Sequence, residues 1–89
     1  MSWTVEFERL ARKEFKKLGV PDQKKIIRYL REKVAPDPRR FGKALGGNLS
    51  GLWRYRVGDH RIVCRIEDDN LVVLIIRIAH RSRVYQRRS

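Results

Sequence analysis

The chain has 89 residues, a length that suits a single domain over residues 1–89. Its hydrophobic content of 42% is ordinary for a globular protein, which excludes disorder throughout. The formal net charge of +12 is large for this size and favours a polyanionic partner: nucleic acid first, an acidic protein second and an anionic membrane third.

Cys64 is the only cysteine, so no internal disulfide can form and a reducing compartment is expected. Its place in a strand-like run predicts a small core hydrophobe. The very apolar stretch over residues 71–76 is far too short to span a bilayer, and no signal-peptide pattern is seen. We therefore expect a cytoplasmic protein.

The first third of the chain predicts one strand and two helices. Residues 2–7 alternate between apolar and polar side chains, which is typical of a strand with one buried face. Apolar residues then recur at helical spacing over residues 7–18, and Gly19 is a suitable stop. Pro21 opens a second helix, which Pro36 ends. Two helices joined by so short a link form an antiparallel hairpin.

Residues 37–51 form the loosest segment, rich in glycine and carrying basic side chains such as Lys43. A loop of this length in a small domain is usually functional or mobile. Phe41, Leu45 and Leu49 are candidates to anchor it to the core. A solvated connector and a binding loop are equally compatible with this composition.

The stretch after residue 51 predicts a hairpin with two different faces. If Gly58-Asp59 is a two-residue turn, Val57 faces His60 and Arg56 faces Arg61. Because side chains alternate with period two, one face then carries Arg54, Arg56, Arg61 and Arg65, and the other carries Trp53, Tyr55, Ile62, Cys64 and Ile66.

Like charges that face each other across a strand pair destabilise a sheet. The arginine face, defined as Arg54, Arg56, Arg61 and Arg65, therefore favours a bound polyanion. The alternative is that carboxylates from elsewhere neutralise it, and the candidates for that are Glu6, Glu8, Glu14 and Glu32.

A second turn at residues 68–70 leads into residues 71–78. Apart from Arg77, these residues are apolar at the positions that face either side of a strand. Such a run predicts a central strand buried on both faces. The fold class is therefore α+β: an N-terminal strand, a two-helix antiparallel hairpin, and a three-stranded antiparallel meander packed on the helices. The N-terminal strand is free to join one edge of that sheet, and the arginine face is expected to stay open.

The segment after residue 78 holds the remaining candidates for chemistry. His80 has no carboxylate pair or cysteine at metal-ligand spacing, so neither a metal nor a cofactor is expected, and a serine triad is equally unsupported. Arginines with a histidine and a tyrosine suit phosphoryl chemistry, in which charge stabilisation dominates. A hydrogen-bonded structural role for His80 is the alternative reading.

The order of these segments resembles the RelE/ParE superfamily of bacterial toxins, in particular its RelE-like branch, and the expected fold is that of a microbial RNase. The match extends over nearly the whole chain. It rests on Leu45-Gly46-Gly47, Leu52-Trp53-Arg54-Tyr55-Arg56-Val57, Asp59-His60-Arg61-Ile62-Val63, Ile78-Ala79-His80-Arg81 and Val84-Tyr85, in that order.

The resemblance implies a metal-independent endoribonuclease that cuts messenger RNA in the ribosomal A site, with the RNA 2′-hydroxyl attacking the adjacent phosphate. Arg61 and Arg81 match positions that stabilise the charged transition state, and Tyr85 matches a tyrosine that orients or stacks on the substrate. The phosphate-binding set is expected to comprise Arg54, Arg56, Arg65, Arg83 and Lys43. The implied partners are the ribosome, messenger RNA and an acidic RelB-like antitoxin that binds the toxin in a heteromeric complex.

One departure from the family pattern affects the chemistry. In the best-known members the positions of Arg54 and Arg56 are lysines. Arginine binds phosphate well but exchanges protons poorly, because the guanidinium pKa exceeds about 12. Proton transfer would then fall on His80 or Tyr85, and we hypothesise that His80 is a general acid or base.

Two other functions are compatible with the sequence. The ParE branch has the same fold but poisons DNA gyrase and cleaves no RNA. A non-enzymatic basic module that binds RNA or ribosomes through the arginine face is the third possibility.

Overall fold

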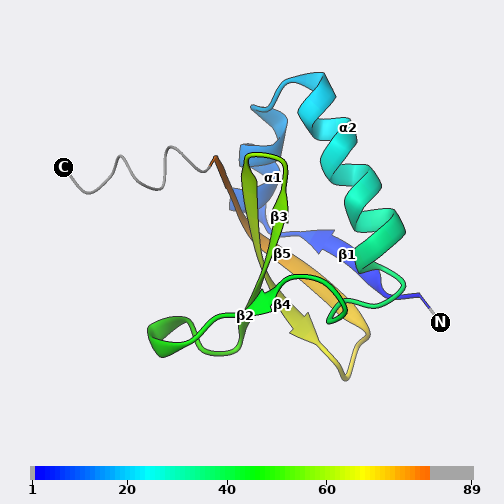
Figure 1. Cartoon of the computed structure of the whole chain (residues 1–89), viewed down its shortest axis with the longest axis vertical. Coiled ribbons are helices and arrows are strands. Elements are labelled where there is room, and N and C mark those ends of the chain that lie inside the picture. Colours follow the sequence, from blue (N-terminus) through cyan, green and yellow to red (C-terminus); the bar gives the residue numbers. More distant parts are fainter. Residues whose placement is uncertain (1, 81–89) are drawn as a thin grey trace.

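The computed structural model describes residues 2–80, which form one five-stranded sheet with helices on one face (Figure 1). The strand order is β1-β5-β4-β3-β2, with β1 parallel to β5 and every other neighbouring pair antiparallel. The strands are β1 (Thr4–Phe7), β2 (Lys43–Ala44), β3 (Leu52–Val57), β4 (His60–Glu67) and β5 (Val72–His80). This arrangement confirms the α+β prediction, including the N-terminal strand at one edge.

The helices are α1 (Arg9–Lys16) and α2 (Val20–Tyr29), and α2 continues into a π-helical turn over Leu30–Val34. The sequence assigned Phe7 both to the end of the strand and to the start of the helical spacing, and the structure places it in β1, paired with Ile75. Pro21 lies in the first turn of α2, where its missing N–H interrupts no hydrogen bond. No helix within residues 2–80 is long and apolar enough to cross a membrane.

The core lies between the helices and one face of the sheet. The helices contribute Ala11, Ile26, Leu30 and Val34, and the strands contribute Tyr55, Val57, Ile62, Cys64, Val73, Ile75 and Ile78. Cys64 is completely buried in this cluster, as the sequence predicts. The opposite face of the sheet has no helix over it within the described residues.

β5 differs from its prediction in three respects. It begins at Val72, because Leu71 has a left-handed backbone (φ 54°) and belongs to the preceding turn. It is buried on one face only, since Leu74 and Ile76 are half-buried on the open side. An irregularity in its pairing with β4 leaves Ile76 as an extra residue.

In the segment between α2 and β3, the part around Phe41 packs on the rest of the protein, whereas the part beyond β2 extends away from it. Phe41 packs edge-on against Tyr29, and its carbonyl accepts a 2.8 Å hydrogen bond from the indole Nε1 of Trp53. Beyond β2 the chain projects from the body and contains a 3₁₀ turn over Gly47–Leu49 (Figure 1). Leu49 is 52% exposed, so its predicted anchoring role was wrong.

Candidate nucleic-acid interface

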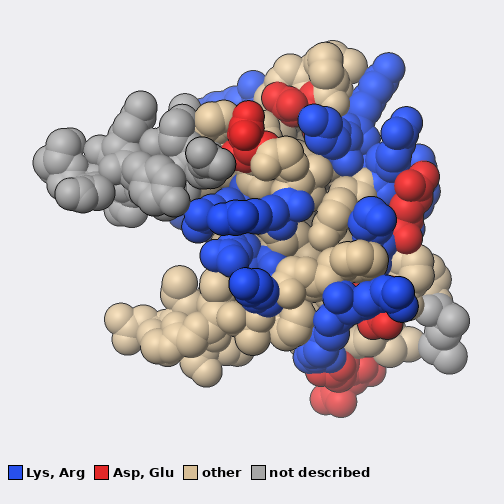
Figure 2. Space-filling view, viewed as in Figure 1, with Lys and Arg blue, Asp and Glu red and all other residues tan. Residues whose placement is uncertain are grey.

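The hairpin of β3 and β4 sets the geometry of the arginine face. The observed register pairs Val57 with His60, Arg56 with Arg61, and Leu52 with Arg65, as the two-residue turn predicts. All four arginines therefore project from the same side of the sheet, away from the helices. Arg56 and Arg65 are exposed, whereas Arg54 and Arg61 are half-buried. Figure 2 shows basic side chains crowded over this part of the molecule, with acidic ones nearer the margins.

Lys43 extends the arginine face through β2. It lies directly opposite Arg54, because the two residues of β2 pair with β3. The sequence predicts a loop at Lys43 and a phosphate-binding set shared with Arg54, but not the short strand that pairs the two residues. A two-residue strand carries too little periodicity to be recognised in a sequence.

Two carboxylates, Glu14 and Asp68, form ion pairs with basic side chains outside the arginine face. Within residues 2–80, the structure describes an ion pair of Arg39 with Asp68 (2.8 Å) and another of Arg77 with Glu14 (3.0 Å). Neither pair includes Arg54, Arg56 or Arg65. The arginine face therefore keeps a strong positive potential that suits a phosphodiester chain.

His80, by contrast, lies on the helix-side face of the sheet. It is paired with His60 across β4 and β5, and the two rings meet edge-on with centroids 5.2 Å apart and an angle of 88°. His60 is 6% exposed, whereas His80 is exposed. On the arginine face the position opposite Arg61 is held by Ala79. The structure thus does not bring His80 together with the four arginines.

Two other groups that can carry protons are held in the core. Burial raises the pKa of the Cys64 thiol to about 11 and also raises the pKa of the Tyr55 phenol. The Tyr55 hydroxyl donates a 2.7 Å hydrogen bond to the carbonyl of Pro38. Neither group is a nucleophile or a general base at neutral pH.

Three of the predicted site residues, Arg81, Arg83 and Tyr85, lie outside the described residues. Within residues 2–80, no three His, Cys, Asp or Glu side chains gather as a metal site would require.

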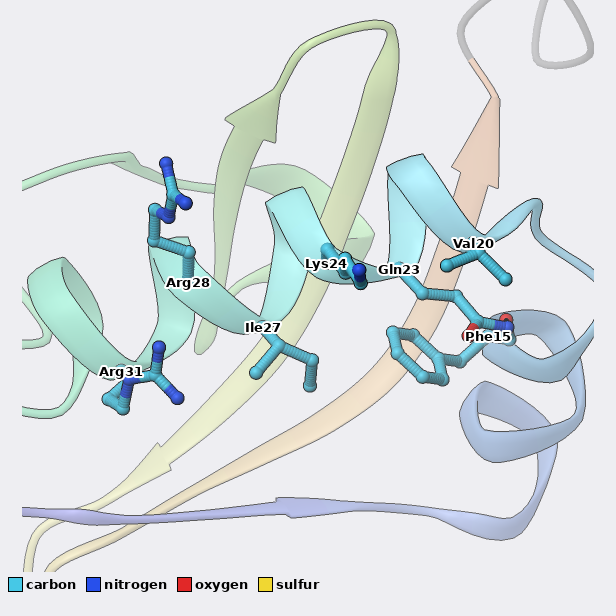
Figure 3. Close-up of a pocket in the computed structure, with 7 residues that line it drawn as sticks. All are labelled: Phe15, Val20, Gln23, Lys24, Ile27, Arg28 and Arg31. Atoms are coloured by element: carbon cyan, nitrogen blue, oxygen red, sulfur yellow. Dashed lines mark hydrogen bonds between the residues drawn. The ribbon is translucent and has the colours of Figure 1, made fainter.

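A hollow of about 470 Å³ lies on the helix side of the sheet, where Phe15 at the end of α1 faces α2 (Figure 3). Its lining combines apolar and basic side chains: Phe15, Val20, Gln23, Lys24, Ile27, Arg28 and Arg31. A second hollow of about 240 Å³ shares Ile27 and Arg31 and continues along β1. Ile27 follows the buried Ile26 on α2, yet it is 37% exposed and lines both hollows.

Comparison with known proteins matches residues 5–85 to the family of the ParE toxin of type II toxin–antitoxin systems, parDE. The Mycobacterium tuberculosis toxin RelG is 32% identical over 98% of this chain and 100% of its own length. The toxin–antitoxin complex RelBE2 of M. tuberculosis contains a chain with a TM-score of 0.86 and 30% identity, covering 92% of this chain and 94% of that one. The isolated E. coli RelE toxin superposes with a TM-score of 0.75 and 27% identity, covering 96% and 93%. The chain therefore belongs to the RelE/ParE superfamily of type II toxin–antitoxin toxins, in its RelE-like branch.

Proposed function

We propose that this toxin is a ribosome-dependent endoribonuclease that cuts messenger RNA in the A site and so arrests translation in the cytoplasm. The observation that carries the proposal is the arginine face, four arginines on an open sheet surface. Carboxylates such as Glu14 and Asp68 pair with other basic residues. Relatives with the name RelE or RelG support the same branch.

In the proposed reaction the 2′-hydroxyl of the RNA attacks the adjacent phosphorus. The O2′–P bond forms and the P–O5′ bond breaks, leaving a 2′,3′-cyclic phosphate and a free 5′-hydroxyl. The proton of the 2′-hydroxyl goes to a base, and the leaving O5′ receives one. No metal is needed, because guanidinium groups bind the phosphate oxygens and stabilise their developing charge.

We assign the phosphate contacts of this reaction to the arginine face and to Lys43. Arg61 is half-buried on β4, the middle strand of the sheet, and a charge–charge interaction there is less screened by solvent than at a fully exposed side chain. Arg81 and Tyr85 complete the proposed catalytic set, and Arg83 adds a further phosphate contact, on the strength of the family resemblance. Substituting Arg61 by alanine should therefore lower the cleavage rate more than substituting the exposed Arg65.

Proton transfer is assigned to Tyr85 rather than to His80. His80 shares its face of the sheet with the buried His60, whereas a phosphate bound to Arg56 and Arg61 lies on the opposite face. We expect the His80→Ala variant to keep the pH dependence of the cleavage rate. Loss of one limb of that pH profile would instead restore His80 as the acid or base.

The function is tested by a toeprint on translating ribosomes with the purified toxin, run in parallel with a DNA gyrase supercoiling assay. Cuts within A-site codons, with supercoiling unaffected, are the expected result. Intact message with inhibited supercoiling would identify a gyrase poison of the ParE type. Ribosome binding that weakens with salt, without any cleavage, would identify a non-enzymatic binding module.

The proposed partner is an acidic RelB-like antitoxin, since solved relatives from M. tuberculosis and E. coli are toxin–antitoxin complexes. The two hollows along α2 suit an amphipathic acidic segment, because apolar side chains such as Ile27 lie between basic ones such as Arg28 and Arg31. Binding there would leave the arginine face free unless a second segment of the antitoxin covers it.

A further inference from the structure

Among residues 2–80, the last part of β5 has a neighbouring strand on one side only. Its pairing with β1 ends at Ile75, which accepts a hydrogen bond from the N–H of Glu8. Beyond the extra residue Ile76, β5 pairs with β4 but presents an open edge where β1 has turned into α1. An open edge leaves backbone N–H groups without a strand partner.

Glu14 of α1 takes the place of the missing strand at this edge. Its Oε1 accepts a 2.7 Å hydrogen bond from the backbone N–H of Ile78, and its Oε2 accepts a 3.0 Å hydrogen bond from the Nε–H of Arg77. The same carboxylate forms an ion pair with the Nη2 of Arg77, also at 3.0 Å. The Glu14 side chain is 20% exposed and that of Arg77 is 54% exposed, so the backbone contact is the better shielded of the two.

We propose that Glu14 is a positioning residue for catalysis, which fixes the end of β5 beside Arg61. The inference rests on the proposed function. Ile78 is next to Ala79, which lies directly opposite Arg61, and Arg81 follows His80 in the sequence. A shift of this strand end therefore moves the backbone that lies directly beside Arg61.

The contact joins parts of the chain that are far apart in the sequence, α1 and the end of β5. A charge-assisted hydrogen bond to a backbone N–H is directional, so it fixes the strand in position rather than merely attracting it. The ion pair with Arg77 is more exposed and is screened by solvent. The positioning effect is thus assigned to the bond between Glu14 and Ile78.

The test compares three variants of the full chain by single-turnover cleavage of ribosome-bound message. Glu14→Ala removes the contacts with both Ile78 and Arg77. Glu14→Gln keeps an oxygen that accepts a hydrogen bond from the Ile78 N–H, and Arg77→Met removes only the contacts with Arg77. Glu32→Ala is the matched control, because it deletes an exposed glutamate on the π-helical turn. Amide hydrogen exchange of Ile78 and of the core residue Ile62 is measured on the same samples.

We expect Glu14→Ala to lower the cleavage rate constant by roughly 10- to 100-fold, as a misplaced reacting group does, with the half-saturating toxin concentration nearly unchanged. The Ile78 amide should lose protection while the Ile62 amide keeps it. Glu14→Gln, Arg77→Met and Glu32→Ala should each stay within about threefold of the unmodified toxin, which corresponds to less than about 1 kcal/mol.

Equal cleavage by Glu14→Ala and the unmodified toxin would overturn the inference while leaving the proposed function standing. A loss of protection at both Ile78 and Ile62 would also overturn it, because Glu14 would then act on global stability. If the unmodified toxin cleaves no message, the proposed function fails, and the positioning role fails with it whatever the exchange data show.

Discussion

Substituting Arg56 by glutamine should raise stability and weaken RNA binding at the same time. Arg56 and Arg61 are directly opposed on β3 and β4, where the Cβ atoms of such a pair lie about 5 Å apart. Removing one of two like charges in this arrangement should raise the free energy of unfolding by about 0.5 kcal/mol, since cross-strand pairs contribute roughly 0.2–1 kcal/mol. For a domain of this size that gain corresponds to a rise in Tm of roughly 2–4 °C.

The stability gain is measured by thermal unfolding followed by circular dichroism, at low salt and again at about 1 M salt. Screening shortens the range of charge repulsion to about 3 Å at that concentration, so the gain should largely vanish. Lys13→Gln is the matched control, because it removes an equal charge from α1, away from the arginine face. It should leave Tm nearly unchanged.

The binding loss is measured with a single-stranded RNA oligonucleotide between 50 and 200 mM salt. Each lost phosphate contact lowers the slope of log affinity against log salt by about 0.7 for a single strand. Arg56→Gln should show that change, and Lys13→Gln should not. A lower Tm together with unaltered RNA binding would refute the reasoning, because Arg56 would then be a structural residue with a carboxylate partner.

Three further predictions concern other parts of the chain. Ile27→Asp should weaken antitoxin binding measured by calorimetry without altering cleavage, and unchanged affinity would remove the α2 hollows from the interface. Gly42→Ala should lower the free energy of unfolding, measured in urea, by about 2 kcal/mol or more, because φ is +79° and a Cβ would collide with the Arg54 carbonyl oxygen. A decrease of less than about 0.5 kcal/mol would contradict this. The hydrogen bonds from Arg39 hold the pKa of the Asp68 carboxyl below its usual value of about 3.9. The contribution of this pair to stability is therefore complete above about pH 4 and is lost only as the pH falls through the lowered pKa; an NMR titration midpoint at or above about 3.9 would contradict the contact.

The strand register was predictable because two local rules agree. A two-residue turn at Gly58-Asp59 and the period-two alternation of β3 and β4 leave only one pairing that buries Tyr55 and exposes Arg56. The arginine face follows from that pairing without any tertiary information. The order of strand, two helices and meander was also predictable. The spacing of apolar residues changes between strand-like and helical segments, and Gly19 and Pro21 mark the boundary between the helices.

The position of His80 was not predictable, because it depends on one extra residue in β5. An unbroken alternation would place His80 on the same face as Leu74, which lies opposite Arg65. The extra residue Ile76 switches the face from which each following side chain projects, so His80 lies beside His60 on the helix side. Nothing in the apolar sequence around Ile76 marks where the extra residue occurs.

Contacts between segments far apart in the chain could not be predicted from the sequence either. Glu14 was one of four glutamates considered as possible partners for the arginine face, but it binds Arg77 and the N–H of Ile78 instead. Its choice of partner follows from where β1 ends and α1 begins, which is a tertiary property. The exposure of Ile27 has a similar origin, since the helical stripe is wider than the surface that the sheet covers.

Cleavage of messenger RNA by this toxin is tested most directly by mapping the ends of message fragments produced on translating ribosomes. We expect cuts within the A-site codon, fragments that end in a 2′,3′-cyclic phosphate, and a strong loss of both with Arg61→Ala. Intact message in the presence of folded toxin, or cleavage that Arg61→Ala leaves undiminished, would contradict it.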